Sequence, residues 1–116
     1  GVTLLSCESM MPYLPSLFGW DGFGFIGSDS NVRVSSTKGM TGHLLGAAGA
    51  IEAVLTVAAL QKGQLPLNIG CFNQDPNCSV NLVTAENSDA SNARYAISNS
   101  FGFGGHNAVL AFKKWE

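Results

Sequence analysis

The sequence is poor in charge, cysteine and histidine, and each scarcity excludes a class of protein. Only 12% of the 116 residues are charged and the formal net charge is −2, so no basic patch for nucleic acid is expected. The three cysteines, Cys7, Cys71 and Cys78, are odd in number and lack paired spacing, which favours neither a disulfide framework nor a zinc site. Adding His43 and His106 gives no metal-ligand spacing either. A reducing compartment such as the cytoplasm is expected.

The first 31 residues also lack lysine and arginine, and they show no sustained hydrophobic period. Residues 22–27 spell Gly-x-Gly-x-x-Gly, but no acidic residue lies about 20 positions later, so a dinucleotide site is not favoured. We expect this segment, residues 1–31, to be poorly packed, either non-native or disordered.

Four later stretches have the composition of short strands. They are residues 31–35, 80–83, 93–98 and 108–112. The last two are separated by residues 99–107, which contain three glycines. That connection is too long and too glycine-rich for a simple hairpin turn, and glycine there would bring backbone N–H groups close to a ligand.

A long apolar helix is expected from Thr41 to about Lys62, with Thr41 as the N-cap and Gly63 as the C-cap. Apolar residues cover nearly every face, which is typical of a helix buried in a core or in a membrane. Glu52 lies near its middle, where a carboxylate in a bilayer would cost about 2.5–3.5 kcal/mol or more. A helix buried between sheets is therefore favoured over a membrane span.

His43 and Lys38 are the side chains best suited to chemistry. At a helix N-terminus the macrodipole would disfavour imidazolium, so His43 would stay neutral and could donate to a developing oxyanion. The alternatives are a histidine that only caps or packs, and a solvated loop lysine. Glu52 would be costly to bury unpaired, so we predict that it pairs with Lys38 through tertiary packing.

Two long motifs stand in order along the chain. Residues 36–52 include Ser-Thr-Lys followed by Thr-Gly-His-Leu-Leu-Gly, and residues 99–107 are Asn-Ser-Phe-Gly-Phe-Gly-Gly-His-Asn. Together they resemble the C-terminal half of β-ketoacyl-acyl-carrier-protein synthases, over about residues 32–114. The resemblance implies an α/β fold, the C-terminal half of a thiolase-like fold, with a buried helix packed on a mixed sheet. Residues 32–116 would then be a C-terminal ketoacyl synthase domain fragment, and residues 1–31 would be unmatched.

The resemblance implies an acyltransferase of fatty acid or polyketide biosynthesis, which condenses an acyl thioester with malonyl-carrier protein by a decarboxylating Claisen reaction. It implies that His43 hydrogen-bonds the malonyl thioester carbonyl and stabilises the enolate, and that Lys38, paired with Glu52, organises the site electrostatically. Phe103 would be a gating residue whose backbone N–H helps to form the oxyanion hole. The loop that would border the acyl pocket consists of Gly102, Phe103, Gly104 and Gly105.

The implied partner is acyl carrier protein, whose phosphopantetheine arm carries the substrate, and no metal or other cofactor is implied. The full-length enzyme would be a homodimer without a membrane span, in the cytoplasm or in an organelle that houses fatty acid synthesis.

Two parts of the family pattern are missing from this sequence. The His-x-Thr-Ser-Thr motif expected upstream of the lysine is absent from residues 1–31, and the nucleophilic cysteine belongs to an N-terminal half. The three cysteines present stand in other contexts. We therefore expect the chain alone to lack condensing activity, because removing one member of a catalytic unit abolishes most of the rate. The alternative is a non-catalytic module that pairs with an intact synthase.

Overall fold

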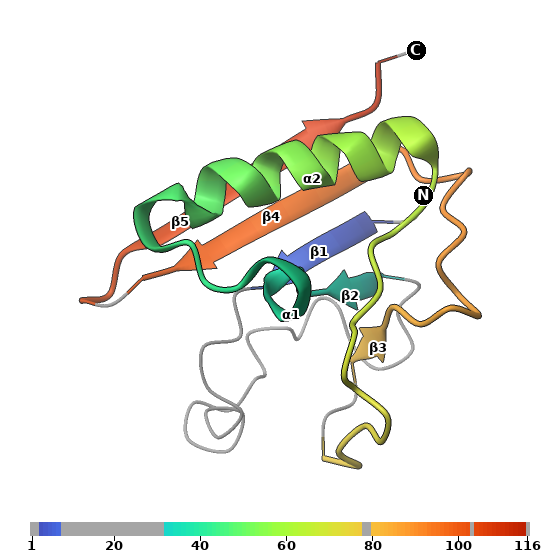
Figure 1. Cartoon of the computed structure of the whole chain (residues 1–116). Helices are drawn as coiled ribbons and strands as arrows, with labels where there is room; N and C mark the ends of the chain where they lie inside the picture. Colours follow the sequence, from blue (N-terminus) through green and yellow to red (C-terminus); the bar gives the residue numbers. More distant parts are fainter. Residues whose placement is uncertain (1–2, 8–31, 78–79, 103, 116) are drawn as a thin grey trace.

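The computed structural model describes residues 3–7, 32–77, 80–102 and 104–115 (Figure 1). Its elements are β1 (Thr3–Cys7), β2 (Arg33–Ser35), α1 (Lys38–Thr41), the 3₁₀ turn η3 (Leu45–Ala47), α2 (Ala48–Lys62), β3 (Asn81–Leu82), β4 (Tyr95–Phe101) and β5 (Asn107–Lys113). One long helix lies across a mixed sheet, which confirms the α/β architecture expected from the sequence.

In the described part of the chain, the sheet has five strands in the order β3-β2-β1-β4-β5. The pairs β2–β3, β1–β2 and β1–β4 are parallel, whereas β4 and β5 form an antiparallel hairpin. The backbone of β1 thus lies in the middle of the sheet, in a position where the sequence analysis predicted no strand (Figure 1). Residues 8–31 of the segment predicted to be poorly packed lie outside the described residues.

α2 packs on β4 and β1 through one face. Its buried residues recur every three to four positions, which is the spacing of one face of an α-helix. They are Ala48, Glu52, Thr56, Ala59 and Leu60. The helix ends as predicted at Gly63, whose left-handed conformation (φ 66°) lets its N–H donate to the carbonyl of Ala59 at 2.9 Å.

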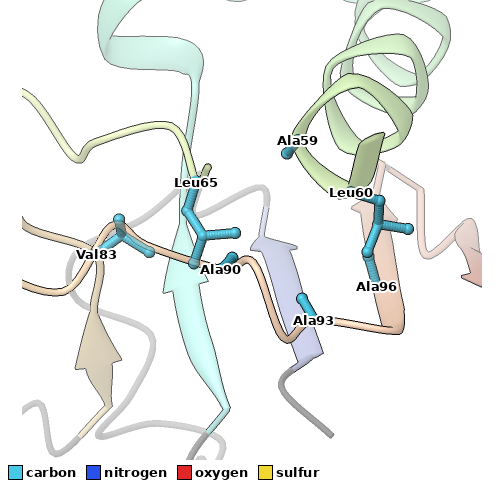
Figure 2. Packing of buried hydrophobic residues seen from close by; sticks show 7 residues of the cluster. All are labelled: Ala59, Leu60, Leu65, Val83, Ala90, Ala93 and Ala96. Atoms are coloured by element: carbon cyan, nitrogen blue, oxygen red, sulfur yellow. The ribbon is translucent and has the colours of Figure 1, made fainter. Parts of the chain in front are cut away.

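The main core cluster lies between the C-terminal end of α2, the start of β4 and the loops beside them. Figure 2 shows Leu60 directed at Ala96 of β4, and Leu65 directed toward Val83 and Ala90. The cluster also contains Ala59 and Ala93. Small side chains predominate, so the helix can approach the sheet closely at this end.

The opposite face of α2 is apolar and exposed, with Ile51 39%, Val54 65% and Val57 37% accessible. The prediction of a helix buried on every side is therefore wrong for the described chain, because a single sheet covers only one face. The segment Leu45–Lys62 is long and apolar enough to cross a bilayer, but length and composition alone are weak evidence for a span. Glu52 lies on the covered face and pairs with Lys38, as expected for a helix that packs on protein.

Candidate active site

The segment of residues 37–43, called the lysine turn below, begins just after β2 ends. Its backbone hydrogen bonds define the single helical turn α1. The carbonyl of Thr37 accepts the N–H groups of Met40 at 2.9 Å and Thr41 at 3.0 Å. Gly42 then ends α1 with φ 73° and ψ 176°, a conformation open to glycine but rarely to other residues. The chain leaves the helical path at this glycine, and Thr41 is not the N-cap of α2.

α2 begins only at Ala48, seven residues later than the sequence predicted. Gly42 ends the first turn and Gly46 lies within η3, and glycine disfavours a continuous helix by about 1 kcal/mol relative to alanine. Leu45 between them has a positive φ of 50°, which is uncommon for a residue with a side chain. Because the helix is interrupted, His43 lies in an exposed loop before η3 and away from the α2 N-terminus.

A local hydrogen bond orients the ring of His43. The backbone N–H of Leu45 donates to Nδ1 at 3.0 Å. A ring nitrogen that accepts a hydrogen bond carries no proton, so the proton of the neutral imidazole is on Nε2. The neutral donor expected at His43 stays a prediction, and the dipole of α2 does not support it because α2 begins only at Ala48.

Lys38 and Glu52 form the ion pair that the sequence predicted: the Nζ of Lys38 donates to Oε1 of Glu52. Their side chains are only 15% and 5% exposed. The pair joins α1 to the middle of α2, across 14 positions of sequence. A carboxylate this deeply buried depends on its partner, since a buried ion left alone costs several kcal/mol.

Two buried oxygens beside this pair have no hydrogen-bond partner among the described residues, namely Oε2 of Glu52 and Oγ1 of Thr37. The hydroxyl of Thr56, one turn after Glu52, instead donates to the Glu52 backbone carbonyl at 2.7 Å. Among the described residues, Lys38 is therefore the hydrogen-bond donor on which the Glu52 carboxylate depends.

The glycine loop joins β4 to β5 in five residues, 102–106, so the predicted nine-residue connection is wrong. The reason is that Asn99 and Ser100, which the sequence analysis placed in the connection, are paired with Val109 and Ala108 in the hairpin. Gly102 donates its N–H to the carbonyl of His106 at 2.7 Å and closes the loop.

Left-handed glycines build the tip of this loop, with φ 88° at Gly104 and 84° at Gly105. A Cβ on Gly104 would lie 3.8 Å from Cδ2 of His106, so the backbone passes next to the imidazole. Phe103 lies outside the described residues, and its gating role stays a prediction.

Several side chains that the sequence did not predict hold the segment before α1 in place. Asn68 bonds to both β2 and the segment after β3, and the Ser35 hydroxyl donates to the Pro66 carbonyl at 2.6 Å. Buried Arg33 donates to the carbonyls of Asn87 and Asp89. All of these bonds join residues more than 30 positions apart or lie in loops, where no local pattern signals them. In the ranges that the structure covers, no group of three or more His, Cys, Asp or Glu side chains is placed to hold a metal ion.

Residues 23–72 match the family model described as the C-terminal domain of β-ketoacyl synthase. Over 86 residues, 74% of this chain, the sequence is 54% identical to 3-oxoacyl-[acyl-carrier-protein] synthase 2 of Synechocystis sp.. It is 49% identical over the same length to the synthase of that name from Staphylococcus aureus. The chain spans about 20% of the length of either relative. On these matches, the chain is similar to the C-terminal domain of the β-ketoacyl-acyl-carrier-protein synthases.

Proposed function

We propose that this chain supplies the enolate-stabilising part of the active site of a 3-oxoacyl-acyl-carrier-protein synthase of fatty acid biosynthesis. The observation that carries the proposal is one short segment with two features. Lys38 is held in a largely buried pair with Glu52, and five residues later the Nδ1 atom of His43 accepts the Leu45 N–H. The names of the relatives support the reaction class.

The step assigned to His43 is stabilisation of negative charge on a thioester oxygen. When the bond between the methylene and carboxylate carbons of a malonyl thioester breaks, CO2 leaves and the electron pair passes into the thioester, forming an enolate. A neutral imidazole with its proton on Nε2 donates to that oxygen and keeps its proton. The enolate carbon then attacks the acyl thioester carbonyl, whose thiolate leaves.

Lys38 contributes a fixed positive charge to the same site. Because the ammonium group is mostly withdrawn from water and paired on one side by Glu52, its position is defined before substrate arrives. Preorganised charge in a site of low dielectric stabilises a developing anion more strongly than charge in water does. The pair therefore serves the reaction through electrostatics, with no proton transfer assigned to it.

The proposal requires partners for this chain. Acyl carrier protein would bring both substrates on its phosphopantetheine arm, with no metal required. A nucleophilic cysteine and a second histidine would come from the remaining part of a synthase. The apolar outer face of α2, with Ile51, Val54 and Val57 exposed, offers a surface for that part to cover.

A chimera tests the function most directly. The matching 86 residues of the Synechocystis synthase are replaced by those of this chain, and 3-ketoacyl product is measured from acyl- and malonyl-carrier protein. The chimera is expected to form product, and Lys38→Met in the chimera is expected to remove most of the rate. Lys62→Met is the matched control, since Lys62 is an exposed lysine in the last turn of α2.

The purified chain of 116 residues is expected to form no ketoacyl product by itself. A well-folded chimera without activity would contradict the proposal. If the unaltered chain co-purified with an intact synthase, and the folded chimera were inactive, the non-catalytic module would be the better account.

A further inference from the structure

The side chain of Asn68 is the meeting point of three segments. Its Oδ1 accepts the backbone N–H of Ser36 at 2.8 Å. Its Nδ2 donates to the carbonyl of Val34 at 2.9 Å and to that of Val83 at 3.2 Å. One amide group thereby ties the end of β2, and the residue just beyond it, to the chain after β3.

The residues on either side of Asn68 contact the same region. The Ser35 hydroxyl donates to the carbonyl of Pro66. Gly39 in α1 packs closely on Ile69: a Cβ on Gly39 would lie 3.2 Å from the Cγ1 atom of Ile69. Figure 1 shows this yellow-green segment, which follows α2, running past α1 and β2. Residues 66–69 therefore form a support beneath the lysine turn.

α1 needs such a support because it cannot hold its place alone. It has four residues, and the Thr37 side chain makes no capping hydrogen bond. A single turn is unfavourable in isolation, since it fixes several backbone dihedrals for very few bonds. The direction in which Lys38 leaves β2 is thus set by tertiary contacts, and the bond to Ser36 N–H lies two residues before it.

We propose that Asn68 is a positioning residue of the active site: it holds the segment of residues 37–43 so that Lys38 meets Glu52. This role deepens the proposed function and rests on it, because the site is a catalytic one only if that function holds. It assigns to Asn68 no contact with substrate.

Asn87 provides a matched control. Its Oδ1 accepts the Thr84 N–H at 2.6 Å, and its Nδ2 donates to the Leu82 carbonyl at 2.9 Å and to Asn81 Oδ1 at 3.2 Å. The Thr84 hydroxyl also donates to Oδ1, at 3.4 Å. Like Asn68, Asn87 is thus a half-buried asparagine whose amide group joins several backbone and side-chain groups, but its partners lie around β3. A variant at Asn87 removes comparable structure without touching the lysine turn.

The test compares Asn68→Ala and Asn87→Ala in the 15N-labelled full chain by amide exchange and by the ammonium signal of Lys38. Asn68→Ala is expected to speed exchange of the Ser36, Met40 and Thr41 amides by about 5- to 30-fold, the effect of losing one or two hydrogen bonds. The Lys38 ammonium signal, which persists only while the ion pair shields it, is expected to broaden or vanish. Asn87→Ala is expected to leave these amides and this signal as in the unaltered chain.

The proposal is overturned if both variants lower stability equally while the lysine turn and the Lys38 signal stay unchanged. If Asn68→Ala does not fold, hydrogen exchange in the unaltered chain tests the proposal instead. A Ser36 amide that exchanges as fast as exposed backbone refutes the proposal, and one protected as well as the amides of β2, together with protected Asn68 side-chain protons, supports it. None of these readouts involves condensation, so an inactive chimera would count against the function and leave the positioning of the turn to be judged separately.

Discussion

Replacing Lys38 with methionine isolates the energetic role of the buried ion pair. Methionine keeps much of the length and apolar volume of the side chain but removes the charge that Glu52 depends on. Glu52 is 5% exposed in its side chain, and its Oε2 already lacks a partner among the described residues. Breaking a buried pair by removing one member costs about 3–5 kcal/mol. Total stability for a domain of 116 residues is about 6–17 kcal/mol, so the loss would be a large share of it.

The assay is urea unfolding of the 116-residue chain followed by far-UV circular dichroism, to which α2 contributes strongly. With a urea m-value of about 2 kcal/mol/M, the loss corresponds to a midpoint lower by about 2 M. Replacing both members with methionine is expected to recover most of that loss, because an apolar pair of similar volume avoids the desolvation penalty. The double-mutant cycle therefore yields a large coupling energy.

Lys62→Met controls for the loss of a lysine as such. Lys62 is exposed at the end of the same helix, so its replacement should change stability by less than about 0.5 kcal/mol. If Lys38→Met cost no more than Lys62→Met, or if the double variant were no more stable than Lys38→Met alone, the buried-pair argument would be refuted.

Three further predictions concern the core, a turn and a surface carboxylate. Leu60→Ala should lower the free energy of unfolding by about 2–4 kcal/mol in the same urea assay, because Leu60 is 4% exposed and packs on Ala96. Val54→Ala, on the exposed face of α2, should lower it by less than about 0.5 kcal/mol. Gly42→Ala should destabilise by about 1–3 kcal/mol, since ψ 176° at φ 73° is strained for alanine; Gly46→Ala, where a Cβ meets nothing within 4 Å, should cost far less. Hydrogen bonds from the Ser91 backbone and side chain, with a weaker contribution from Arg33, lower the pKa of Asp89 from its ordinary 3.8. The Asp89 carboxylate thus contributes stability that is fully present above pH 3.8 and is lost as pH falls through the lowered pKa. The urea midpoint of Asp89→Asn should therefore lie below that of the unaltered chain at about pH 5, and the difference between the two midpoints should shrink toward pH 3.

The sequence predicted those features that depend on local pattern or on a conspicuous exception to it. Glu52 was the exception in an apolar helix, and the cost of burying it alone pointed to Lys38 as its partner. The strand at Arg33–Ser35 and the hairpin strands followed from strand-like composition, and the C-cap at Gly63 followed from glycine conformation.

The features that were missed depend on tertiary pairing. β1 pairs with a parallel strand on each side, and such an interior position does not require the alternation by which half-exposed strands are recognised. Asn99 lies in β4 at 6% exposure, although the sequence placed it in the glycine-rich connection. The interruption before α2 depends on the backbone of Gly42 and Leu45, and the support from Asn68 depends on bonds over more than 30 positions, neither of which a hydrophobic pattern encodes.

The central claim is that His43, neutral with its proton on Nε2, stabilises the enolate. The most direct test is CO2 release from malonyl-carrier protein by the chimera carrying His43→Ala, relative to the unaltered chimera. Removing a donor to a developing oxyanion is expected to slow decarboxylation by about 10²- to 10³-fold. Decarboxylation at close to the unaltered rate in a correctly folded His43→Ala chimera would contradict the claim.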